Sequence, residues 1–81
     1  MKNSNPWIIE NNSLVKVFTF HNFVQAVDFI NTLVPLAQNM NHHPDLELFS
    51  YKKVKIKLTT HDQNKITEKD KELAKKIDEL F

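Results

Sequence analysis

The sequence predicts an α+β fold: a four-stranded antiparallel sheet with helices packed on one face, in the element order β-β-α-β-β-α. Short apolar segments of strand length come in two pairs, and each pair precedes a longer segment whose apolar residues recur with helical periodicity. Gathering both helices on one face of an antiparallel sheet is the economical way to bury their apolar stripes. With 81 residues, the chain is expected to form one domain, residues 1–81.

The first strand pair is expected at residues 7–10 and 14–20. The second of these segments is rich in Val, Phe and Thr, which favour strands. Between them lies Asn11-Asn12-Ser13, and asparagine tolerates the left-handed backbone that tight hairpins require.

A helix is predicted over residues 22–40, where apolar side chains occupy an arc of roughly 180° at about 100° per residue. One sheet face rarely covers so wide an arc, so a second helix or a second subunit is expected to cover the rest. Pro35 lies on the polar side, which predicts a bend rather than the end of the helix.

In the second half, a strand is expected at residues 46–51. Lys52-Lys53 is either a tight turn or the start of the next strand, which runs through Leu58 and ends at Thr59-Thr60-His61. Apolar and lysine residues alternate along 53–58, as expected for a sheet with one solvated face. The last helix begins after Thr67, a candidate N-cap, with Asp70 at the capping-box spacing. Its expected buried stripe is Leu73, Ala74, Ile77, Leu80 and Phe81.

Composition excludes several functions. The net charge of +1 argues against direct nucleic-acid binding, and no apolar run reaches membrane-spanning length. The absence of glycine excludes glycine-rich phosphate-binding loops, and the absence of cysteine fits a reducing compartment. The N-terminus lacks the apolar segment of a signal peptide. A cytoplasmic protein is therefore expected.

Candidate chemistry lies in His42-His43-Pro44 and in His61. Histidine exchanges protons near neutral pH, and adjacent residues in extended backbone point to opposite sides, so His42 and His43 should diverge. Three interpretations stand side by side at this point: polar loop residues, proton-transfer catalysis and a metal site. The metal site is the weakest, because the chain has no cysteine and no closely spaced histidine motif.

Other features have plainer interpretations. The lysines of residues 52–57 are expected to form a solvated face, and Asp70 to cap its helix. Trp7 is expected in the core, with a pocket for a flat ring as the alternative. Asp70 could also orient a histidine without giving up its cap.

One set of residues resembles a known family. His42-His43-Pro44 is followed seven residues later by Tyr51, ten further by His61 and nine further by Asp70. This pattern is similar to that of the pterin-4a-carbinolamine dehydratases, also called dimerisation cofactors of a homeodomain transcription factor. The resemblance covers residues 7–80. It departs from the family at Gln38, where members commonly carry a charged residue, and in the short segment before Trp7.

The resemblance implies a hydro-lyase, 4a-hydroxytetrahydrobiopterin dehydratase, which eliminates water from the pterin 4a-carbinolamine to give quinonoid dihydropterin during tetrahydrobiopterin recycling. His42 and His61 would be the acid–base pair, with Asp70 behind them as a partner of His61. His43, Pro44, Trp7 and Gln38 would bind or orient the pterin. The resemblance implies no metal and no other cofactor.

A second function remains open, because the family resemblance also includes a role in stabilising transcription-factor dimers. Gln38 favours this alternative, a catalytically weak binding or assembly module. In both cases the wide apolar arc predicts self-association, as a homodimer or a homotetramer.

Overall fold

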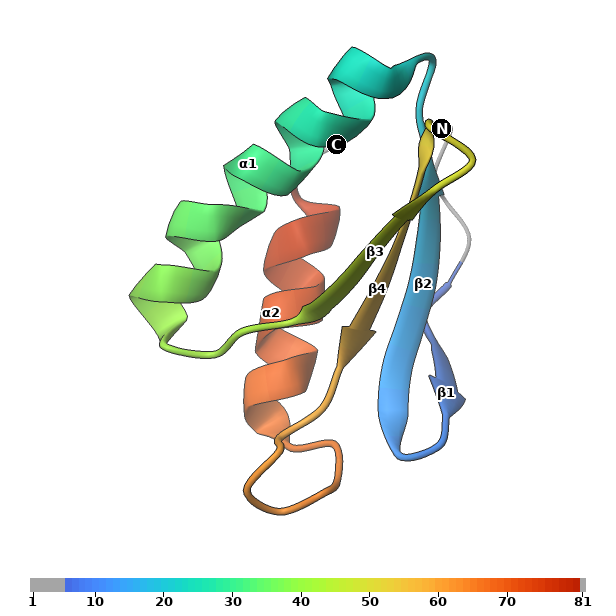
Figure 1. Ribbon diagram of the computed structural model, residues 1–81. Coiled ribbons are helices and arrows are strands. Elements are labelled where there is room, and N and C mark those ends of the chain that lie inside the picture. The colour runs from blue at the N-terminus through green and yellow to red at the C-terminus, as the bar shows by residue number, and fades with distance from the viewer. Residues whose placement is uncertain (1–5, 81) are drawn as a thin grey trace.

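The computed structural model describes residues 6–80. Its elements follow the predicted order (Figure 1): β1 (Ile8–Glu10), β2 (Ser13–Thr19), α1 (Phe23–Met40), β3 (Asp45–Phe49), β4 (Lys53–Leu58) and α2 (Glu68–Asp78). The predicted α+β class is confirmed, with four antiparallel strands and two helices. The expectations for residues 1–5 and for Phe81 lie outside the described residues.

The four strands form one antiparallel sheet in the order β1-β2-β4-β3. Both helices lie on the same side of this sheet (Figure 1). Strand β4 is central, so that Val54 is opposite Phe18 on β2 and opposite Leu48 on β3. Strand β4, the last in the chain, therefore lies between β2 and β3, two strands that α1 separates in the sequence.

Alternation along β4 separates the two faces of the sheet. Val54, Ile56 and Leu58 face the helices and are at most 1% exposed, while the intervening lysines are only partly buried. The apolar side of β4 packs with Phe18 of β2 and with residues of both helices in one core cluster. If this alternation continues beyond Leu58, Thr60 faces the helices and His61 faces away from them.

Helix α1 begins at the N-cap Asn22, whose side chain accepts a hydrogen bond from the Gln25 backbone N–H at 2.8 Å. It continues through Pro35, as predicted, and ends at Asn41, which has φ 50°. Only part of its apolar arc is buried, in the core shared with the sheet and α2: Ala26, Phe29, Leu33 and Ala37. The rest of the arc lies at the surface or is partly buried.

Tight turns are made without glycine. Asn11 and Asn12 have φ of 51° and 63°, and the second hairpin turns at Ser50 and Tyr51, with φ of 49° and 53°. The prediction that residues 46–51 form one strand is wrong at its end. Strand β3 stops at Phe49, because Ser50 and Tyr51 adopt the left-handed backbone that reverses the chain.

Helix α2 begins after the predicted N-cap Thr67, and its buried apolar stripe contains Leu73, Ala74 and Ile77. The prediction for Leu80 is wrong: the helix ends at Asp78, and Leu80 is 42% exposed. Across residues 6–80, neither helix is long and apolar enough to cross a membrane.

Candidate functional site

The end of α1 directs His42 towards the second helix. Asn41 takes the left-handed conformation as C-cap, and the backbone N–H of His42 then donates to the carbonyl of Ala37 at 3.1 Å. This local closure turns the chain back at the helix terminus. The His42 side chain is only 10% exposed as a result.

Asp70 holds the His42 ring. The Nε2 atom of His42 lies 2.5 Å from Oδ1 of Asp70, and the Asp70 side chain is fully buried. A buried carboxylate needs hydrogen-bond donors to offset the loss of hydration, and the imidazole is one of them. The contact joins the start of α2 to the residue after the C-cap of α1.

The second oxygen of Asp70 is bound as well. Oδ2 accepts from the hydroxyl of Thr60 and from the backbone N–H of Thr67, each at 2.9 Å. Asp70 therefore caps α2 and binds a histidine at the same time, one oxygen for each task. The prediction that these two roles do not conflict is confirmed.

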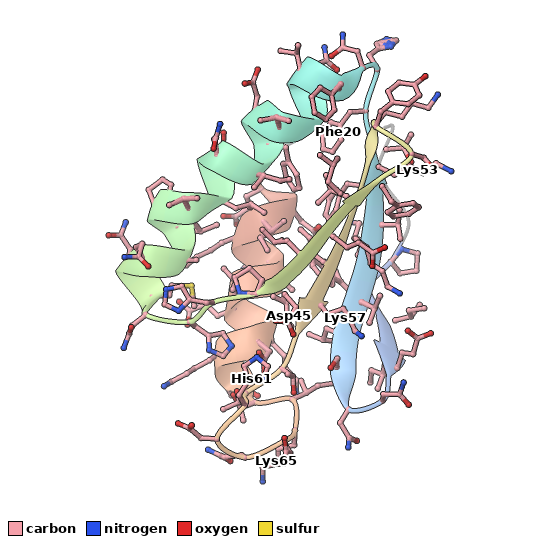
Figure 2. All side chains as sticks on the ribbon, in the orientation of Figure 1. Phe20, Asp45, Lys53, Lys57, His61 and Lys65 are labelled. Atoms are coloured by element: carbon pink, nitrogen blue, oxygen red, sulfur yellow. The ribbon has the colours of Figure 1, made fainter. Side chains whose placement is uncertain are left out.

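The expected partnership between Asp70 and His61 is wrong. Alternation beyond β4 turns Thr60 towards the helices, where it is 9% exposed, and the next residue, His61, the opposite way. His61 is 64% exposed and lies 3.8 Å from Oδ2 of Asp45, measured from its Nε2 atom. Figure 2 shows the labelled Asp45 and His61 close to each other at the same end of the sheet.

His43 diverges from His42, as the extended backbone predicts. Its Nε2 atom lies 2.6 Å from Oε1 of Gln38, on the exposed side of α1. A glutamine oxygen can only accept, so the ring donates its Nε2–H, which in a neutral ring leaves Nδ1 as an acceptor. Gln38 therefore orients His43 without adding a charge. Pro44 immediately precedes β3 and is half-buried.

Trp7 is not brought to the histidines. Its indole N–H donates to both carboxylate oxygens of Asp78, at 3.2 and 3.1 Å, and its ring packs edge-on against Phe18. Asp78 also pairs with the buried Lys16 at 2.9 Å. Eight residues of α2 separate Asp78 from Asp70, a rise of about 12 Å. Trp7 thus belongs to a structural cluster at the other end of α2.

Three residues of this region were not among the site residues predicted from the sequence. Thr60 and Thr67 join their hydroxyls at 2.6 Å behind Asp70, and Asp45 approaches His61. For Thr60, the signal was available in its position directly before a candidate histidine on the buried side of an alternating strand. For Asp45, only the tertiary structure reveals the neighbour, since its register partner on β4 is Lys57 and His61 lies beyond the strand.

A surface groove of about 490 Å³ adjoins the same region and is lined by Thr60, Gln63, Lys65, Ile66, Thr67, Glu68 and Lys69. It shares two threonines with the Asp70 cluster but is lined by none of the three candidate histidines. Within residues 6–80, no three His, Cys, Asp or Glu side chains are grouped so that they could hold a metal ion.

The fold and this cluster define a class: a small α+β protein in which a buried carboxylate anchors His42, while His61, just beyond the central strand, is solvent-exposed. Comparison with known proteins gives the family. The profile described as "Pterin 4 alpha carbinolamine dehydratase" matches residues 1–80. The chain therefore belongs to the pterin 4 alpha carbinolamine dehydratase family.

Two relatives carry the name "Putative pterin-4-alpha-carbinolamine dehydratase". The protein from Sulfurisphaera tokodaii is 53% identical over 93% of this chain and 80% of its own length. The protein from Sulfolobus acidocaldarius is 47% identical over 91% of this chain and 80% of its own length.

Two solved structures share the fold. A transcriptional coactivator/pterin dehydratase from Brucella melitensis superposes with a TM-score of 0.84 at 28% identity, covering 91% of this chain and 80% of the other. A pterin dehydratase-like protein, described as a RuBisCO assembly factor in the alpha-carboxysome, has a TM-score of 0.77 at 23% identity. This second match covers 96% of this chain and 92% of the other and shows the fold alone.

Proposed function

We propose that this protein is a 4a-hydroxytetrahydrobiopterin dehydratase, a cytoplasmic hydro-lyase that acts in tetrahydrobiopterin recycling. The family assignment supports the reaction class. The observation that carries the proposal is the fully buried Asp70, which holds Nε2 of His42 at 2.5 Å. A carboxylate behind an imidazole orients the ring and stabilises the imidazolium that forms when the ring accepts a proton.

Elimination of water needs two proton movements. The C–O bond at the 4a position breaks, the leaving hydroxyl takes up a proton to become water, and a ring N–H of the pterin loses one to give the quinonoid dihydropterin. Two imidazoles can perform both steps without a metal. General acid–base catalysis of this kind typically contributes about 10²–10⁴ in rate.

The contacts of the two histidines support different parts for them. A neutral His42 that donates Nε2–H to Asp70 keeps a lone pair on Nδ1, which suits a base. His61 is 64% exposed and can regain a proton from solvent after protonating the leaving hydroxyl. His43, held by Gln38, would orient the pterin beside Pro44. Trp7 would contribute to the core instead of to the pterin site.

The test is the dehydration of a chemically generated 4a-hydroxytetrahydropterin. We expect His42→Ala and His61→Ala each to lose about 10²–10⁴ in kcat, since each removes one proton-transfer group. His21→Ala is the matched control, because His21 lies before α1 and, within residues 6–80, bonds to Gln25 through its backbone N–H. A wild-type rate equal to that in buffer would contradict the proposal, as would loss of the activity with a chelator.

A second candidate is a binding or assembly module with weak catalysis. The contact of His43 with Gln38, at 2.6 Å, is the observation that favours it, since Gln38 is a group that cannot ionise. In that case the pterin would bind without turnover, and titration calorimetry beside the dehydration assay would separate the two candidates.

A further inference from the structure

Asp70 makes one connected set of side-chain hydrogen bonds that extends beyond the histidine. Its side chain is fully buried, and donors reach it from three different segments: His42 after α1, Thr60 after β4 and Thr67 before α2. Beyond Asp70, the hydroxyls of Thr60 and Thr67 meet at 2.6 Å.

The direction of each bond follows from the number of protons available. A threonine hydroxyl has one proton, and that of Thr60 is donated to Oδ2 of Asp70 at 2.9 Å. Thr67 must therefore donate its own hydroxyl proton to Thr60. Oδ2 also accepts the backbone N–H of Thr67, so two donors already point at this oxygen.

The directions of these hydrogen bonds determine which oxygen of Asp70 is available to His42. With Oδ2 satisfied by two donors, Oδ1 is the oxygen that remains for the imidazole, and as a carboxylate oxygen it accepts Nε2–H. Within residues 6–80, Nδ1 of His42 has no hydrogen-bond partner, and no buried side-chain nitrogen or oxygen lacks one. Nδ1 therefore reaches the surface as the free acceptor.

Thr60 also holds the segment that carries His61. Its backbone N–H donates to the carbonyl of Lys65 at 3.0 Å, and its carbonyl accepts from the N–H of Gln63 at 3.0 Å. The next residue along the chain is His61. One threonine is thus bonded through its hydroxyl to the carboxylate that holds one histidine, and through its backbone to the loop that begins with the other.

We propose that Thr60 is a positioning residue of the acid–base site: the chain of donors from Thr67 to Thr60 to Asp70 keeps His42 in the Nε2–H tautomer and fixes its ring relative to His61. The catalytic part of this inference depends on the dehydratase function proposed above. The tautomer does not, because it follows from the hydrogen bonds alone.

The decisive measurement is nitrogen NMR of the imidazole of His42. In the neutral ring of the wild-type protein, we expect the proton on Nε2 and a bare Nδ1. A wild-type ring that carries its proton on Nδ1 would overturn the proposal, whatever the activity of the protein and whether or not any variant folds.

The variants separate positioning from folding. Thr60→Val keeps the shape of the side chain and removes the donor to Oδ2, so the Asp70 carboxylate can rotate and the tautomer preference of His42 should weaken. We expect kcat to fall about 10- to 100-fold, by analogy with the hydrogen-bond partners that orient metal-bound histidines, with a smaller change in KM. Thr60→Ser restores the hydroxyl and should restore both the imidazole spectrum and kcat.

Thr59→Val is the matched control, since Thr59 is the adjacent residue and its hydroxyl bonds to the carbonyl of Asn12 at 3.0 Å, away from Asp70. It should leave the His42 spectrum and kcat unchanged. A folded Thr60→Val protein with wild-type imidazole signals and kcat would refute the positioning role. An inactive wild-type protein with the expected tautomer would refute the dehydratase function and leave the assignment of the tautomer intact.

Discussion

At the scale of single residues, Asp70 divides its two oxygens between a helix and a histidine. Oδ2 receives the backbone N–H of Thr67 at the first turn of α2, and Oδ1 receives the ring of His42. A buried carboxylate left without one of these donors would lose part of the interaction that offsets its burial, which typically costs about 1–3 kcal/mol. Stability and site geometry are therefore coupled through one side chain.

This coupling predicts how substitutions combine. We expect Asp70→Asn to lower kcat about 10- to 100-fold, because the amide no longer offers two acceptor oxygens and the His42 ring loses its orientation. In a His42→Ala background the same substitution should cost much less, since the ring that it orients is gone. The measurement is a double-mutant cycle on the dehydration rate.

The matched cycle uses His61→Ala. Asp70→Asn should keep most of its effect there, because His61 lies beside Asp45 and has no bond to Asp70. Equal coupling of Asp70 to both histidines would contradict the assignment of Asp70 to His42. Unfolding curves for each variant separate lost geometry from lost stability.

At the scale of elements, the hairpin between β3 and β4 carries local strain. Ser50 and Tyr51 both have positive φ, and for a bulky residue the left-handed region costs about 1–2 kcal/mol. Tyr51 is 60% exposed, so its side chain recovers little of this by packing. The sequence missed this turn because aromatic residues ordinarily favour strands.

Relief of this strain should stabilise the protein. We expect Tyr51→Gly to raise the free energy of unfolding by up to about 1 kcal/mol, because glycine adopts positive φ without a steric penalty. Tyr51→Ala is the control: it removes the same ring but keeps the penalty, so it should give no gain. Urea unfolding measures both, and a gain of equal size for alanine would show that the ring, not the backbone, is the cause.

At the scale of the whole molecule, the sheet leaves part of α1 uncovered. Phe23 and Val34 are 52% and 53% exposed, and Val27 and Ile30 between them are partly buried. These four residues lie within an arc of about 60° beside the buried stripe. The apolar arc of α1 is therefore wider than the rest of the described protein covers, as the sequence predicts. Self-association through this uncovered surface remains a prediction.

Association should therefore depend on this uncovered stripe. We expect the wild-type protein to sediment as a dimer or tetramer at micromolar concentration, and Val34→Glu to shift it towards the monomer, because a buried carboxylate at a contact is costly. Thr32→Glu, on the polar side of the same helix, should have no such effect. A monomeric wild-type protein would refute this prediction.

The order of the elements can be predicted from the sequence alone, because apolar periodicity and turn residues act locally. The spacing from His42-His43-Pro44 to Tyr51, His61 and Asp70 resembles the family pattern, and the family assignment is confirmed. Which carboxylate contacts which histidine depends on the tertiary fold. His42 and Asp70 are 28 residues apart, and their contact depends on how α1 ends and on which face of the sheet Thr60 and His61 point to. Such contacts depend on register and packing through space, which local sequence patterns do not encode.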